Sequence, residues 1–299
     1  MSKYAINEEF LQQVEALQII LKNNVAGLFG GNHKSKTYGS SCEFTDYRDY
    51  IPGDDITKID WNAFARFDKF YLKLYLDERQ LHTRIYIDAS RSMDYNEKKS
   101  ETSLKIAATL AYLSICEMDK VSMYYIKQNK VHEVFENIVG KEAFYNNIGK
   151  LNNIEFSDDC FISDSILPVK VGYGDGMSVI ISDFLTNNNY ENAIDYLVDK
   201  KRDLFCFQVL SKDELKPNVR GKVHFYDSEN VNRQYRKNIN KDIIDAYKEA
   251  VNYVTNRISN YCNSRGAGYA LVRAENTVSE IFLKVLPEMG VLKWVFYIL

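Results

Sequence analysis

Three oxygen-bearing side chains, Asp88, Ser90 and Ser92, stand at alternate positions directly after an apolar run, and Asp183 directly follows another run. Carboxylates and hydroxyls are hard oxygen ligands, which suit Mg²⁺ or Mn²⁺ better than zinc. Because hydroxyls are neutral, a bound ion keeps much of its charge and can accept a partner's carboxylate at an open coordination position. The alternative is that Ser90 and Ser92 only cap the loop and helix that follow them.

The two apolar runs predict the strands that position these residues. LHTRIYID ends at Asp88, and MSVIIS is a continuous apolar run of the kind found in central strands covered on both faces. Strands alternate with helices from residue 81 onward, which predicts an α/β domain with a mainly parallel sheet flanked by helices. Ligands of such sheets bind beyond the carboxyl ends of the strands, so we expect Asp88 and Asp183 to meet at one rim.

The chain before residue 81 has a different pattern. Apolar residues at helical spacing predict an amphipathic helix that packs on the domain. They are Phe10, Val14, Leu17 and Leu21. Residues 34–77 are dense in aromatic and charged side chains. We therefore expect residues 1–80 to form an N-terminal helix and a β-rich extension, and residues 81–299 to form the α/β domain.

Composition and charge argue for a cytoplasmic protein that does not bind nucleic acid. The 38 basic and 41 acidic residues give a net charge of −3, without the basic footprint of a nucleic-acid binder. The five cysteines are scattered, without zinc-like spacing, and are expected to be reduced thiols. We see no signal-peptide pattern and no apolar stretch of the roughly 20 residues that span a bilayer. The C-terminal GVLKWVFYIL is too short to span and is expected to be a final strand or a docking segment.

Several segments resemble known families. DASRSMD resembles the Asp-x-Ser-x-Ser signature of the metal-ion-dependent adhesion site in von Willebrand factor A domains, and ISDF resembles the third metal loop of that family. A longer and more specific block closely resembles the hallmark of domain-of-unknown-function family 58, and the likeness covers nearly the whole chain. It runs GSSCEFTDYRDYIPGDDITKIDWNAFARFDKFYLK, with further likeness in VLSKDEL, FYDSEN and CNSRGAGYALVR.

The resemblance implies a von Willebrand A-like, Rossmann-like fold with metal ligands at Asp88, Ser90, Ser92 and Asp183. It also implies frequent pairing with MoxR-type AAA+ ATPases in protein maturation or complex assembly. The second metal loop normally supplies a threonine hydroxyl, but the best register places Cys160 there. A thiol is a poor ligand for magnesium, so this departure weakens the expected site.

The block from residue 43 to residue 66 has a structural alternative to a catalytic role. Its IPGDD segment fits a β-turn, with Pro52 and Gly53 at positions that suit them. Its charged side chains are expected to form an ion-pair lattice around Trp61 and Tyr50 that fastens the segment to the main domain, which we favour over catalysis. They are Glu43, Arg48, Asp54, Asp55, Lys58, Asp60 and Arg66.

We expect a non-enzymatic interaction module that captures a protein partner at the metal rim. The rival hypothesis is a magnesium-dependent phosphoester hydrolase with Asp94 as base. Two features argue against it: Ser90 occupies the second place of an Asp-x-Asp nucleophile motif, and no histidine or lysine partner is expected for the site. A third possibility is a structural domain whose metal site has decayed, which Cys160 supports. GYGDG mimics a phosphate loop, but a strand follows it where a helix is required.

Overall fold

The computed structural model describes residues 6–28, 44–75, 81–94, 97–157, 159–174, 176–185, 190–217, 221–226 and 234–288. The chain divides into two compact units, one made of Met1–Val25 together with Leu81–Leu299 and the other of Ala26–Gln80. Residues 1–25 therefore belong with residues 81–299, whereas we had grouped them with the extension. The reason is that the apolar face of the first helix is buried in the core of the larger unit.

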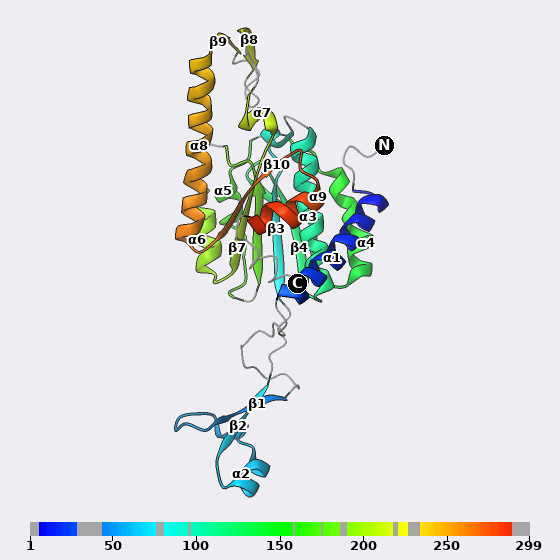
Figure 1. The fold of residues 1–299 in the computed structure, drawn as a ribbon, viewed down its shortest axis with the longest axis vertical. Coiled ribbons are helices and arrows are strands. Elements are labelled where there is room, and N and C mark those ends of the chain that lie inside the picture. Colours follow the sequence, from blue (N-terminus) through cyan, green and yellow to red (C-terminus); the bar gives the residue numbers. More distant parts are fainter. Residues whose placement is uncertain are drawn as a thin grey trace. The chain divides into compact units, whose positions relative to one another are not determined.

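The larger unit contains a six-stranded sheet in the order β10-β7-β6-β3-β4-β5 (Figure 1). Its strands are β3 (His82–Asp88), β4 (Lys120–Lys127), β5 (Lys130–Ile138), β6 (Met177–Ser182), β7 (Asp203–Leu210) and β10 (Gly268–Arg273). All neighbours are parallel except β4 and β5, which form the expected hairpin. Numbered along the chain, this is the doubly wound order 3-2-1-4-5-6, so the topological switch point lies between β3 and β6. The predicted fold class is confirmed.

Helices cover both faces of the sheet, because its strands are apolar on both sides. In β6, Val179 and Ile181 lie in one core cluster and Ile180 lies in the other. The first face is covered by α1 (Glu8–Leu28), α3 (Glu97–Cys116), α4 (Lys141–Ile148) and the segment of α9 (Val278–Glu280), a π turn (Ile281–Val285) and α10 (Leu286–Glu288). The second face is covered by α5 (Ile162–Ile166), α6 (Glu191–Asp199) and α8 (Lys241–Ser264).

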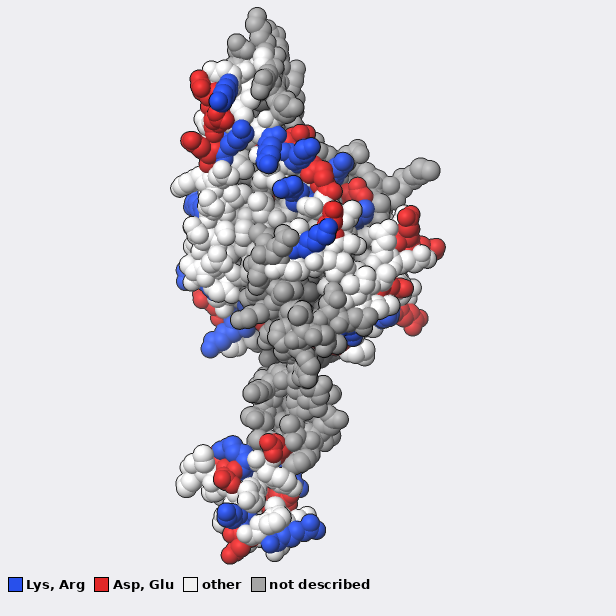
Figure 2. Space-filling model, in the orientation of Figure 1, with Lys and Arg blue, Asp and Glu red and all other residues white. Residues whose placement is uncertain are grey.

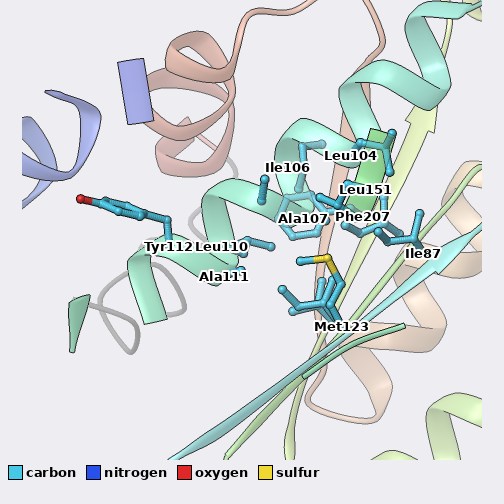
Figure 3. Close-up of a cluster of buried hydrophobic side chains, with 14 of the residues drawn as sticks. Ile87, Leu104, Ile106, Ala107, Leu110, Ala111, Tyr112, Met123, Leu151 and Phe207 are labelled. Carbon is cyan, nitrogen blue, oxygen red and sulfur yellow. The ribbon is translucent and has the colours of Figure 1, made fainter. Parts of the chain in front are cut away.

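The centre of the first core lies between α3 and the sheet. Figure 3 shows Ala107 and Leu110 of α3 on the side of the helix that faces Phe207 and Met123 of the sheet, all four of them buried. Apolar positions at helical spacing predicted α3 from residue 105, but the helix begins at Glu97. Its first turns carry buried polar side chains, which the apolar pattern does not reveal.

At the opposite end of the sheet, Gly176 and Arg202 fix the start of β6 against β3. Gly176 has φ +145°, and a Cβ there would overlap the backbone of His82. The guanidinium of Arg202 donates to Ser178 Oγ at 2.9 Å, to the carbonyl of Met177 at 2.8 Å and to the carbonyl of His82. GYGDG thus leads into a strand, as the sequence indicated, and its last glycine packs against the backbone of His82.

Two antiparallel strand pairs lie outside the main sheet. In the smaller unit, β1 (Phe44–Asp49) pairs with β2 (Tyr71–Tyr75), and a 3₁₀ turn (Ile56–Lys58) and α2 (Trp61–Phe67) connect them. In the larger unit, β8 (Gly221–Tyr226) pairs with β9 (Gln234–Ile239), between the short α7 (Lys212–Leu215) and α8. The sequence predicted the first strand of this second pair but not its partner. The C-terminal GVLKWVFYIL lies outside the described residues.

Charge on the described surface is mixed in sign. Figure 2 shows lysine, arginine, aspartate and glutamate side chains interspersed on the face it presents. None of the helices in the described ranges is both long and apolar enough to cross a membrane. Four of the cysteines, Cys116, Cys160, Cys206 and Cys262, are free thiols, and Cys42 lies outside the described residues.

Candidate functional site

The switch point of the sheet brings Asp88 and Asp183 together. Asp88 is the last residue of β3, and Asp183 directly follows β6, its parallel neighbour, in which Ile181 lies opposite Ile87. Both carboxylates therefore lie at the carboxyl edge of the sheet, where doubly wound folds bind ligands. Both residues are 1% exposed, so their carboxylates lie buried beneath the surface of the rim.

The loop after β3 is held by Asp88. Its Oδ1 accepts a hydrogen bond from the backbone N–H of Ser90 at 2.9 Å, and its Oδ2 accepts one from Ser182 Oγ at 2.6 Å. The hydroxyl oxygens of Ser90 and Ser92 lie 3.0 Å apart. In this loop Asp88 accepts the turn's backbone N–H, and the two serine hydroxyls contact each other.

A buried lysine, which the sequence analysis did not expect, lies beside Asp183. Nζ of Lys99 donates to Asp183 Oδ2 at 2.8 Å and to Glu214 Oε1 at 2.8 Å, and the Lys99 side chain is 0% exposed. A signal was present in the sequence, because Lys99 falls at helical spacing with Ser103, Ile106 and Leu110 on the buried face of α3. A lysine on such a face needs an acidic partner.

Glu214 connects this ion pair to α7. Its Oε2 accepts from the backbone N–H of Ser211 at 2.7 Å, while the Ser211 hydroxyl accepts from the Glu214 N–H at 3.3 Å, which is a capping box. The remaining oxygen, Oε1, is the one that binds Lys99. VLSKDEL, which the sequence analysis noted only as part of a resemblance, thus supplies a carboxylate to the rim.

Cys160 lies at the rim too, in agreement with the register that put it in place of a threonine. Burial raises the pKa of its thiol well above the usual value, and the charge of Asp88, to which the thiol is hydrogen bonded, raises the pKa further. The thiol is therefore neutral at physiological pH. A neutral buried thiol adds little to the binding of a hard cation.

The carboxylates at the rim have different partners. The Lys99 ammonium contacts Asp183 and Glu214, whereas the described hydrogen bonds of Asp88 come from Ser90 and Ser182. Burial raises the pKa of Asp88, and the negative charge of Asp183 raises it further, while hydrogen bonds from Ser182 and Ser90 lower it. Either a proton or an added cation would relieve the repulsion between Asp88 and Asp183.

The donor set fits a hard divalent cation on chemical grounds. Its oxygens come from Asp88, Ser90, Ser92 and Asp183, which are the carboxylate and hydroxyl ligands that such an ion prefers. Among the described residues, there is no group of three or more His, Cys, Asp or Glu side chains arranged for a metal. An ion here would therefore depend on the serine hydroxyls.

Asp94, the base of the rival hydrolase hypothesis, follows the same loop. Its Oδ1 accepts a hydrogen bond from Ser100 Oγ at 3.3 Å, and its side chain is only partly exposed. The contact ties Asp94 to the start of α3.

The block in the smaller unit is organised around Asp60. Its carboxylate accepts from the N–H of Asn62 at 2.9 Å and from Tyr47 OH at 2.8 Å, and it pairs with Lys73 at 3.2 Å. The Tyr47 hydrogen bond is the main reason that the pKa of Asp60 is lowered to about 2. Arg48 pairs with Asp54 at 2.8 Å. These contacts lie within the smaller unit, and of them only the pair of Arg48 and Asp54 is an ion pair between two residues of the expected lattice. The fastening of this segment to the main domain stays a prediction, and Glu43 lies outside the described residues.

The chain belongs to the family described as "Protein of unknown function DUF58", whose match covers residues 46–256. This confirms the family resemblance drawn from the block and from VLSKDEL and FYDSEN, while CNSRGAGYALVR lies beyond the matched residues. Proteins described as uncharacterized from Mycobacterium bovis and Mycobacterium tuberculosis are 27% identical over 104 residues, which is 34% of this chain and 33% of theirs. The chain thus spans about a third of the length of the curated relatives it matches.

Solved structures with a similar arrangement are distant. An aerotolerance-related membrane protein from Bacteroides fragilis is 14% identical, with a TM-score of 0.36 over 70% of this chain and 98% of the other. The VWA domain of SpRpn10 is 8% identical, with a TM-score of 0.38 over 69% of this chain and 94% of the other. At these TM-scores neither likeness carries an argument, and the fold class follows from the strand order.

Proposed function

We propose that this protein is a non-enzymatic protein-interaction module whose contact surface is the rim at the carboxyl ends of β3 and β6. We further propose that the rim binds Mg²⁺ or Mn²⁺ through Asp88, Ser90, Ser92 and Asp183. The observation that carries the proposal is the position of two buried carboxylates and two facing hydroxyls at the switch point of the sheet.

Each residue has a distinct role in the proposed site. Asp88 orients the loop through the Ser90 N–H, and its carboxylate supplies negative charge. Ser90 and Ser92 supply neutral oxygens, which leave the ion able to bind a carboxylate of the partner. Asp183, fixed by the N–H of Leu185 at 3.1 Å, supplies the second negative charge. When bound, the ion would provide an electrophilic contact point for an acidic side chain.

The partner we propose is a MoxR-type AAA+ ATPase acting in protein maturation or complex assembly. Its support is the family resemblance, because the charges and contacts of the rim specify an acidic group but no particular protein. An acidic side chain from such a partner would complete the coordination of the ion.

Metal titration of the whole chain tests the rim itself. We expect Mn²⁺ to bind the wild type with one site by calorimetry and electron paramagnetic resonance, and Ser90→Ala and Ser92→Ala to weaken binding at least tenfold. Ser264→Ala is the matched control, because this exposed serine bonds only the Tyr261 carbonyl of its own helix among the described contacts. Equal binding by all four proteins would refute the metal site.

Recovery from native lysate tests the partner. Tagged wild-type protein with magnesium and ATP is expected to retain a MoxR-type ATPase, identified by mass spectrometry, and Asp88→Ala and EDTA treatment are expected to lose it. If no such ATPase is retained, the partner assignment fails.

Assays of turnover separate the module from the hydrolase. Magnesium-dependent hydrolysis of a generic phosphoester, abolished by Asp88→Ala, would replace the interaction module with the hydrolase. Absence of both metal binding and turnover would favour the structural domain with a decayed site.

A further inference from the structure

Lys99 connects three parts of the fold that surround the proposed metal rim. It lies in the first turn of α3, directly after the loop of Ser90 and Ser92. Its ammonium binds the carboxylate that follows β6 and the carboxylate that caps α7, at 2.8 Å in each case. The ammonium is fully buried, and Glu214 is 14% exposed, so water screens this pair little.

The ammonium and a bound metal would share one carboxylate. Asp183 Oδ2 accepts from Lys99, and Asp183 Oδ1 accepts from the Leu185 N–H. A cation that approaches Asp183 therefore meets a carboxylate whose charge is already partly neutralised. Two cations beside the same buried carboxylate also repel each other, and this repulsion is strong where the effective dielectric constant is low.

We infer that Lys99 is a built-in counter-cation of the rim, which weakens metal binding at Asp183 to a degree set by Glu214. This inference rests on the metal site of the proposed function. Glu214 draws the Lys99 charge away from Asp183 and adds a negative charge of its own, so it favours the metal. The affinity for the metal is thus governed by a charge pair that contacts the ligand Asp183 and, in its described contacts, neither of the proposed hydroxyl donors.

Removal of the ammonium tests the inference directly. We expect Lys99→Met to tighten Mn²⁺ binding at least tenfold, measured on the full chain by electron paramagnetic resonance and calorimetry at constant ionic strength. Lys105→Met is the matched control, because it removes the same charge from the same helix. Lys105 is partly exposed and pairs with Glu101 at 2.6 Å, so its loss should change the Kd less than twofold.

Glu214→Gln gives the opposite expectation and does not require the buried lysine to be replaced. The glutamine oxygen can still accept from the Ser211 N–H, so α7 keeps its cap, while the lost charge should weaken Mn²⁺ binding three- to tenfold. Asp213→Asn is the control for charge on the same short helix, since Asp213 is exposed. This pair of variants keeps the inference testable if Lys99→Met does not fold.

The outcomes distinguish this inference from the proposed function. Tighter binding by Lys99→Met and weaker binding by Glu214→Gln support the inference. The inference is also supported if Lys99→Met binds Mn²⁺ and the wild type does not. That result would mean that Lys99 replaces the metal and that the metal part of the proposed function is wrong. The inference is overturned if Lys99→Met binds Mn²⁺ as the wild type does or more weakly, or if Glu214→Gln binds it as the wild type does. In that case the proposed metal site still stands, because the wild type binds Mn²⁺. If neither the wild type nor any variant binds Mn²⁺, both fail.

Discussion

The hydroxyl of Ser182 donates a hydrogen bond of 2.6 Å to Oδ2 of Asp88, and this contact joins the end of β6 to the end of β3. The same Ser182 oxygen accepts from the N–H of Phe184, at 3.0 Å, where Phe184 has a φ of 51°. Ser182 therefore links the two loops of the candidate site within the protein interior, although sequence analysis gave it no role.

We expect Ser182→Ala to destabilise the protein by about 2 kcal/mol, because it leaves the buried Asp88 oxygen and the Phe184 N–H without this partner. Urea unfolding measures the change. Ser264→Ala, at an exposed position, should change the free energy of unfolding by less than about 0.5 kcal/mol. Equal stability of the two variants would show that the Ser182 contact contributes nothing.

Gly176→Ala should destabilise by about 3 kcal/mol or more, because the new Cβ would collide with the His82 backbone at a φ of +145°. Gly172→Ala is the matched control in the same segment, since no atom lies within 4 Å of a Cβ placed there. Thermal unfolding of both variants checks this. A small effect at Gly176 would mean that the strand start can shift away from β3.

The half-buried imidazole of His82 should make stability depend on pH in the acidic range. Burial, with the charges of Arg84 and Arg202, lowers the pKa of His82 to about 4. The unfolded chain therefore binds a proton below about pH 6.5 that the folded chain refuses, and stability falls as the pH drops from 6.5 toward 4. Between pH 7.5 and 5 we expect the free energy of unfolding of the wild type to fall by at most about 2 kcal/mol relative to that of His82→Gln.

Asp119 should give the opposite dependence. Burial raises the pKa of this carboxyl to about 7, against the opposing hydrogen bond from the Leu81 N–H. The folded state thus holds a proton that the unfolded state releases above about pH 3.9, and this stabilisation is lost as the pH rises to 7. Between pH 5 and 7.5 the free energy of unfolding of the wild type should fall by about 2 kcal/mol more than that of Asp119→Asn. Parallel pH profiles of variant and wild type would contradict this expectation.

Cys160→Thr should strengthen the proposed metal site, because it restores a hard hydroxyl oxygen where a thiol now contacts Asp88. We expect the Kd for Mg²⁺ or Mn²⁺ to fall by about tenfold, equivalent to about 1.4 kcal/mol. Cys160→Ala serves as the control, since it removes the thiol without adding an oxygen donor. If both variants bind as the wild type does, Cys160 does not belong to the site.

The sequence by itself determined the alternation of strands and helices and the doubly covered β6. Those features depend on local apolar periodicity and on residues next to each other in the chain, such as Asp88, Ser90 and Ser92. It also determined the family, because the block that begins near residue 43 is long and specific.

Only the tertiary structure decided what surrounds the rim. Lys99 meets Asp183 and Glu214 across 84 and 115 residues of sequence, and Ser182 meets Asp88 across 94. Such pairs follow from the order of strands in the sheet, which no local pattern encodes. Burial then sets their strength, because a carboxylate and an ammonium interact strongly only where the fold has excluded water.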